Sequence, residues 1–221
     1  TYTDICSYKF DENGSFVFID NDGPVFANGT ISVKNGSDSS TYNFQDYNYS
    51  DQQWFSEVMI SGLKVREDFS PIGKIQVQLD GTDIESVADV SANGNIYAHT
   101  FQDVKVTEHT TDSGKHTVKY TAENILNQKE TKTVSFNLDC TMPAISIQSQ
   151  SEGKELADNV KYAVAAKSGE VLTIRTSDTG SGIDSTKTKV YVNNTEKTLT
   201  GGKLTLDEVG KYEVKVVAVD K

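Results

Sequence analysis

One strand-like segment of the chain occurs twice. Residues 114–124 read GKHTVKYTAEN and residues 210–220 read GKYEVKVVAVD. The copies share glycine, lysine, a ring residue, valine and lysine, then alanine and a final Asn or Asp at matching places. Self-similarity of this length is typical of a duplicated structural module. The repeat therefore predicts two related bodies in one chain before it predicts any chemistry.

A second pair of segments extends the repeat. Residues 63–72 read LKVREDFSPI and resemble residues 172–183, which read LTIRTSDTGSGI. Each is followed by an apolar–polar alternation and then by a polar turn, Asp80-Gly81 in the first copy and Asn193-Asn194 in the second. Alternation predicts strands with one buried face, and Asp-Gly is a hairpin signal.

An aspartate followed closely by a proline opens each body. Residues 19–25 (IDNDGPV) resemble residues 138–144 (LDCTMPA). Proline holds its own φ and keeps the preceding residue extended, which suits entrance into a first strand. Because strand-like sequence runs up to the last residue, we expect the second domain to be truncated at its C-terminal end. The expected parts are an N-terminal strand or the tail of a preceding module at 1–19, domain 1 at 20–139 with an insertion at about 82–108, and domain 2 at 140–221.

In this order the segments resemble the bacterial immunoglobulin-like repeats of large cell-surface and secreted proteins. The resemblance implies an all-β fold of tandem immunoglobulin-like β-sandwiches, and it informs on fold more than on function because such modules serve many roles. The chain departs from the pattern after Asn124, where Ile-Leu-Asn follows, and at Cys140 and Met142, which replace small residues. The matching features are Trp54, Ser181-Gly-Ile183, GKHTV at 114–118 and LDCTMP at 138–143.

The second copy of the repeat predicts a tyrosine corner. Tyr212 precedes Val214 by two residues, as the corner tyrosine of immunoglobulin sandwiches precedes a core position. We therefore expect the Tyr212 hydroxyl to bond a nearby backbone group and Val214 to lie in the core. The first copy places His116 and Val118 at the corresponding positions, so Val118 is also expected in the core.

The composition argues against several classes of function. A formal net charge of -11 repels nucleic acid and anionic membrane surfaces, and no apolar run is long enough to span a bilayer. The three histidines lack metal-ligand spacing, and no Ser-His-Asp motif, P-loop or dinucleotide fingerprint occurs. We expect a monomer without a nucleic-acid partner or membrane insertion, and no enzyme or catalytic residue within the chain.

Residues 44–55 gather aromatic side chains among amides and carboxylates. Rings supply flat apolar area and the polar groups supply hydrogen bonds, so Tyr47, Tyr49, Trp54 and Phe55 are candidate residues for binding a glycan or a protein. In the alternative interpretation, Trp54 and Phe55 open a core strand and the rings serve packing. The sequence leaves both interpretations open.

Three aspartates lie at the expected module boundaries. Asp20, Asp22 and Asp139 are candidate Ca²⁺ ligands, because this hard cation takes several oxygen ligands in turns. The alternative is that Asp favours turns and solvation without binding an ion. No other cofactor is expected.

The leading functional hypothesis is a non-catalytic, extracellular module pair, secreted or attached to the cell wall. It would act as a spacer, a presentation stalk or an adhesin segment of a large bacterial surface protein, with a host or cell-wall glycan or protein as the expected kind of partner. The alternatives are a glycan- or protein-binding module, or an accessory region of an extracellular glycoside hydrolase.

Overall fold

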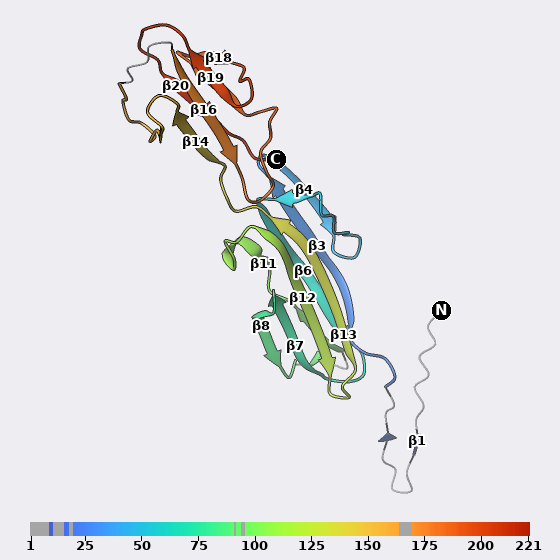
Figure 1. Cartoon of the computed structure of the whole chain (residues 1–221). Helices are drawn as coiled ribbons and strands as arrows, with labels where there is room; N and C mark the ends of the chain where they lie inside the picture. The colour runs from blue at the N-terminus through green and yellow to red at the C-terminus, as the bar shows by residue number, and fades with distance from the viewer. Residues whose placement is uncertain (1–8, 11–15, 18–19, 91, 94–95, 164–168) are drawn as a thin grey trace. The chain divides into compact units, whose positions relative to one another are not determined.

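The chain divides into two compact β-rich units, shown in Figure 1. The computed structural model describes residues 9–10, 16–17, 20–90, 92–93, 96–163 and 169–221. Unit 1 comprises Thr1–Leu138 and unit 2 comprises Asp139–Lys221. The division falls one residue before the domain boundary expected from sequence. Most of the expected N-terminal part, residues 1–19, lies outside the described ranges, and its described pieces, β1 (Lys9–Phe10) and β2 (Phe16–Val17), pair with each other.

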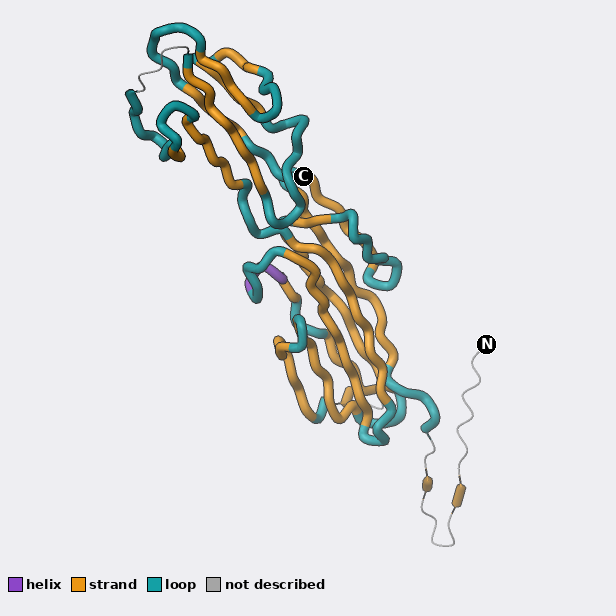
Figure 2. The backbone as a smooth tube through the Cα atoms, viewed as in Figure 1, coloured by secondary structure: helices purple, strands orange, loops and turns teal. Residues whose placement is uncertain are grey.

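Strands make up nearly all of the regular structure, as Figure 2 shows. Within the described ranges, the one helical element is the 3-10 helix η1 (Val106–Glu108). The expectation of an all-β fold is confirmed at this level. None of the helical structure in these ranges has the length and apolar character that crossing a membrane requires.

Unit 1 contains two larger sheets. The first has the order β4-β3-β6-β10-β9, with β11 also paired to β6, and the second has the order β5-β13-β12-β7-β8. The first sheet consists of β4 (Asp38–Asn43), β3 (Val25–Asn35), β6 (Glu57–Glu67), β10 (Ile96–Thr100), β9 (Ala92–Asn93) and β11 (Val104–Lys105). The second consists of β5 (Trp54–Phe55), β13 (Lys129–Leu138), β12 (Gly114–Asn124), β7 (Ile72–Leu79) and β8 (Thr82–Ala88).

Alternate residues of both sheets build the core of unit 1. Along β7, Ile75 and Val77 are fully buried, while Gln76 between them bonds Asp83 on the other face. The rings of Phe44 and Phe101, which follow strands of the first sheet, contact Tyr120 of the second sheet edge-on at 5.6 and 5.2 Å between centroids. The two sheets therefore share one apolar core, an arrangement consistent with a β-sandwich.

Unit 2 repeats this plan with fewer residues. Its sheets have the orders β15-β14-β16-β19 and β18-β17-β20. Its core contains Leu172, Ile174, Val190, Val192 and Leu204. The strands are β14 (Ala144–Ser149), β15 (Lys154–Glu155), β16 (Glu170–Ser177), β17 (Lys189–Val192), β18 (Thr195–Lys197), β19 (Lys203–Leu206) and β20 (Val214–Val217).

The same tight turn follows β7 and β17. Asp80 and Asn193 open the two turns with φ of 49° and 48°, and the residue after each also has positive φ, as a type I′ hairpin requires. The side chain of each turn residue accepts a backbone hydrogen bond at 2.8 Å. Thr117 N in β12 donates to Asp80 Oδ1, and Glu213 N, directly before β20, donates to Asn193 Oδ1. The aligned sequences therefore form matching local contacts.

The hydrogen bond predicted for the Tyr212 hydroxyl is present in unit 2. The Tyr212 hydroxyl donates to the carbonyl of Glu208 at 2.9 Å. In unit 1, His116 Nε2 lies 3.0 Å from the carbonyl of Asp112, which is also four residues upstream. Val118 is fully buried, as predicted. Val214 packs against the core of unit 2 but is only partly buried.

Residues 82–108, expected to hold an inserted hairpin or a long loop, contain strands of both sheets. β8 pairs with β7, and β10 pairs with β6. In unit 2, β18 pairs with β17 and β19 with β16, which are the corresponding places. The additional length of unit 1 in this region consists of the short strand β9, the connections, β11 and η1.

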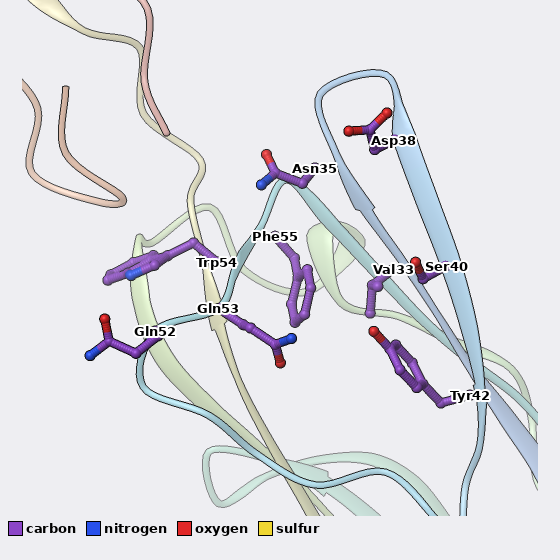
Figure 3. A pocket seen from close by; sticks show the side chains of 9 residues that line it. All are labelled: Val33, Asn35, Asp38, Ser40, Tyr42, Gln52, Gln53, Trp54 and Phe55. Atoms are coloured by element: carbon purple, nitrogen blue, oxygen red, sulfur yellow. The ribbon is translucent and has the colours of Figure 1, made fainter. Parts of the chain in front are cut away.

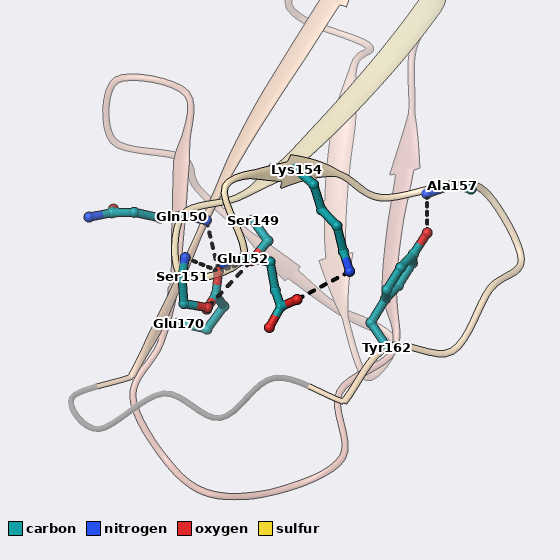
Figure 4. Close-up of polar contacts among 8 residues, drawn as sticks. All are labelled: Ser149, Gln150, Ser151, Glu152, Lys154, Ala157, Tyr162 and Glu170. Carbon is teal, nitrogen blue, oxygen red and sulfur yellow. Dashed lines mark hydrogen bonds and ion pairs between the residues drawn. The ribbon is translucent and has the colours of Figure 1, made fainter.

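A buried glutamate organises the loop after β14 (Figure 4). The Glu170 carboxylate accepts hydrogen bonds from Ser149 Oγ at 2.7 Å and from Gln150 N at 2.9 Å, and the Ser151 hydroxyl also donates to it. Burial alone would raise the pKa of Glu170, but these donors hold it below its ordinary value. The loop is therefore built around an ionised carboxylate.

Candidate functional site

The candidate binding site is a hollow of about 260 Å³ in unit 1, shown in Figure 3. It lies between the β3–β4 hairpin and the segment that leads into β5. Its lining combines aromatic rings with amide, hydroxyl and carboxylate groups. The lining residues are Val33, Asn35, Asp38, Ser40, Tyr42, Gln52, Gln53, Trp54 and Phe55.

A two-residue turn shapes one side of the hollow. Asn35 and Asp38 pair across this turn, and Gly36 at its first central position has φ of 58°, a conformation that glycine adopts without strain. Side chains two residues apart on a strand share a face, so β4 presents Asp38, Ser40 and Tyr42 on the same side.

A buried asparagine positions the opposite side. Asn137 of β13 is 5% exposed, and its Nδ2 donates to the carbonyl of Gln53 at 3.0 Å and lies 3.3 Å from that of Asp51. β5 then runs parallel to β13, with Trp54 opposite Asn137. Asn137 and Gln53 are 84 residues apart in the sequence, so the local pattern could not predict their contact.

The four aromatic residues singled out from sequence separate into two groups. Trp54 and Phe55 line the hollow, and Phe55 is also buried in the core, so both earlier interpretations apply to it. Tyr47 packs edge-on against Tyr42 at 5.4 Å, and burial raises the pKa of its hydroxyl to about 12. Tyr49 donates to Asn137 Oδ1 at 3.1 Å and does not line the hollow.

Sequence reasoning missed most of the polar lining. Asn35, Asp38, Ser40 and Tyr42 precede the aromatic segment, and only the hairpin brings them to Trp54. The signal for them was Gly36-Ser37, a dipeptide typical of two-residue hairpin turns, followed by a polar run.

The polar side chains of the hollow are not engaged elsewhere. Within the described part of the chain, no hydrogen bond or ion pair involves the side-chain polar atoms of Asn35, Asp38, Ser40, Tyr42, Gln52 or Gln53. Only Asp38 among the nine lining residues carries a formal charge. The hollow therefore offers free donors and acceptors with little net charge.

An acidic cluster in unit 2 is the candidate cation site. Asp139, Asp178 and Asp220 each place one carboxylate oxygen within 4.8 Å of the others. Burial would raise the pKa of Asp139, but hydrogen bonds from Ser181 and Thr141 hold it below its ordinary value. Three carboxylates fall short of the about 6–8 oxygens that Ca²⁺ takes, so other oxygens would have to complete such a shell.

The predicted ligands Asp20, Asp22 and Asp139 do not come together within one unit, because the first two belong to unit 1 and the third to unit 2. Asp20 Oδ1 accepts from Asp22 N at 3.1 Å, and its Oδ2 accepts from the Ser70 hydroxyl. Asp139 Oδ2 accepts at 2.7 Å from the backbone N–H of Ser181, where Asp20 accepts from the hydroxyl of the aligned Ser70. Both aspartates therefore fasten the start of a unit to its aligned serine turn.

Comparison with family models, with curated proteins and with solved structures found no match for the chain.

Proposed function

We propose that the chain is a pair of non-catalytic, immunoglobulin-like β-sandwich modules of an extracellular bacterial protein, secreted or attached to the cell wall. The modules act as a spacer or presentation stalk, or as a segment of an adhesin. The observation that carries this proposal is the repetition of one β-rich plan, with a separate apolar core in each unit.

Several matching contacts support the immunoglobulin-like assignment. The tyrosine corner of Tyr212 and the equivalent bond of His116 occupy the places expected for that class. Each unit also has one type I′ turn and one aspartate that accepts a hydrogen bond from the aligned serine. Repeated bodies that each bury their own core suit a mechanical role, because one can remain folded when its neighbour unfolds.

Single-molecule pulling tests the proposal on the whole chain, anchored at its two ends. Each residue contributes about 3.6 Å when extended. The 83 residues of unit 2 (139–221) would release about 300 Å, and the 114 residues from β3 to β13 (25–138) about 410 Å, before the folded lengths are subtracted.

The expected trace contains two separate unfolding events with these two lengths. A single event that releases both units together would contradict independent modules. Extension without measurable resistance would contradict a load-bearing role.

A further inference from the structure

We propose that the hollow in unit 1 binds an uncharged sugar ring of an oligosaccharide. This activity goes beyond spacing and does not depend on it, because all nine lining residues belong to unit 1. Four properties of the hollow favour such a ligand: its apolar surface, its uncommitted polar groups, its charge and its anchored walls.

The apolar part suits the face of a pyranose. Val33 and Phe55 form the floor of the hollow at 4% and 6% exposure, and the ring of Tyr42 beside them is only partly covered. Trp54 precedes Phe55 on β5 and points to the other side of that segment in Figure 3, so its partly covered ring lies at the edge of the hollow. A pyranose presents a face of C–H groups, which packs against aromatic rings in the same way as other apolar surface.

The polar part suits sugar hydroxyls. A carboxamide offers both a donor and an acceptor, and a sugar hydroxyl offers the same two functions. Asn35, Gln52 and Gln53 provide three such amides, and Ser40 provides a hydroxyl. These side chains are exposed, so binding would exchange their bonds to water for bonds to the ligand.

The charge of the hollow excludes acidic ligands. Asp38 is its single charged residue, and Lys34 on the neighbouring strand is paired with Glu57 at 2.7 Å. An anionic sugar would meet this carboxylate within a chain of net charge -11. The volume of about 260 Å³ is below the about 300–1,000 Å³ typical of pockets for drug-sized ligands, which favours one ring at a time.

The walls are held in place before a ligand arrives. Asn137 anchors the segment that carries Gln52 and Gln53, and β5 is paired to β13 directly after it. The opposite wall is a regular hairpin. Anchored walls lower the cost of ordering side chains on binding.

Trp54 provides the assay, because it is the only tryptophan of the chain. The whole chain is titrated with the hexamers of cellulose, xylan, mannan, starch and chitin as neutral probes. A hexamer of galacturonic acid is the anionic probe. We expect at least one neutral probe to change the Trp54 emission in a saturable manner, and the anionic probe to leave it unchanged.

Substitutions locate the binding. Asn35→Ala and Gln52→Ala each remove one exposed amide. Each should lower the affinity for the neutral probe by about fivefold to tenfold, as expected for the loss of one or two hydrogen bonds. Trp54→Ala removes the reporter, so its affinity is measured by calorimetry and should fall further. Phe69→Ala is the matched control, because this ring is 46% exposed in unit 1 but outside the hollow.

Urea unfolding checks that each variant is folded. If Trp54→Ala does not fold, Asn35→Ala and Gln52→Ala still test the proposal. The proposal is overturned if no neutral probe binds at millimolar concentration, or if Phe69→Ala weakens binding as much as the variants in the hollow. Capture of a polypeptide through Asn35 and Gln52, without any response to sugars, would also overturn it.

Discussion

Replacing Glu170 by glutamine should loosen unit 2 and leave unit 1 unchanged. Glu170→Gln keeps the shape of the side chain but removes the charge that Ser149, Gln150 and Ser151 surround. The amide oxygen can keep the bonds from Ser149 and Gln150, but only as bonds to a neutral acceptor. Its NH2 group replaces the oxygen to which Ser151 donates, so the Ser151 hydroxyl would have to turn and accept.

The size of the effect follows from the contacts. A hydrogen bond to a charged acceptor contributes about 1.5–3 kcal/mol and a neutral one about 0.5–1.5 kcal/mol. Two well-formed bonds, from Ser149 Oγ at 2.7 Å and Gln150 N at 2.9 Å, would each lose about 1 kcal/mol on this scale. The expected loss is about 2 kcal/mol, reduced somewhat because the neutral amide costs less to bury.

The pH dependence supplies a second signature. The ordinary pKa of the carboxyl is 4.5, and in the folded chain the donors hold it lower, against the opposing effect of burial. The stabilisation from Glu170 is therefore complete above that ordinary value and is lost as the pH falls through the folded pKa. The difference in stability between wild type and Glu170→Gln should shrink over the same acidic range.

Two probes of urea unfolding separate the units. The emission of Trp54 reports unit 1 alone, whereas hydrogen exchange of peptides from residues 139–221 reports unit 2. Glu170→Gln should lower the protection of those peptides and leave the Trp54 transition in place. The reasoning is refuted if protection is unchanged, or if the Trp54 transition moves by the same amount.

Three further substitutions test other contacts. Gly180→Ala would place a Cβ 2.2 Å from Asp139 Oδ1, so unit 2 should lose about 1–3 kcal/mol, as measured by hydrogen exchange; unchanged protection would contradict the packing. Tyr212→Phe should cost unit 2 about 0.5–1.5 kcal/mol in the same assay by removing the bond to Glu208, and a neutral effect would show that this bond does not stabilise the corner. Burial raises the pKa of Glu67, so its contribution to unit 1 is present at low pH and lost as the pH rises through the folded pKa. Glu67→Gln should abolish that dependence of the Trp54 urea midpoint, and a persisting slope would assign it to another group.

The repeat and the alternation predicted what is local in this fold. Ile75 and Val77 face the core, as the period of two requires. The bond from the Tyr212 hydroxyl to Glu208 was predicted because Tyr212 precedes Val214 by two residues. The sequence pattern assigned β8 to an insertion and not to the sheet, because β8 is an edge strand without a fully buried residue and lacks a clear apolar–polar alternation. Edge strands are defined by their partner more than by their own pattern.

The hollow could be predicted only in part, for a related reason. Trp54 and Phe55 were visible as aromatic residues beside amides, but nothing local distinguishes them from Tyr47 and Tyr49. The difference arises from Asn137, which lies more than eighty residues later and directs the loop (Asn137 to Tyr49, separation 88). A site assembled by such a contact has no signature within either segment.

The alignment of Asp20 with Asp139 holds in the structure, but the two residues share a structural contact and not the ion site first expected. Asp20 and Asp139 were paired by their position before a proline, which suggested ion binding at a boundary. In the structure, each carboxylate accepts a hydrogen bond from the serine of its own unit's aligned turn, Ser70 or Ser181. Closing this turn is a sufficient reason for a carboxylate at both places, since it accepts several bonds at once. The shared position therefore reflects a structural role within each unit, and any cation at Asp139 would be added to that role.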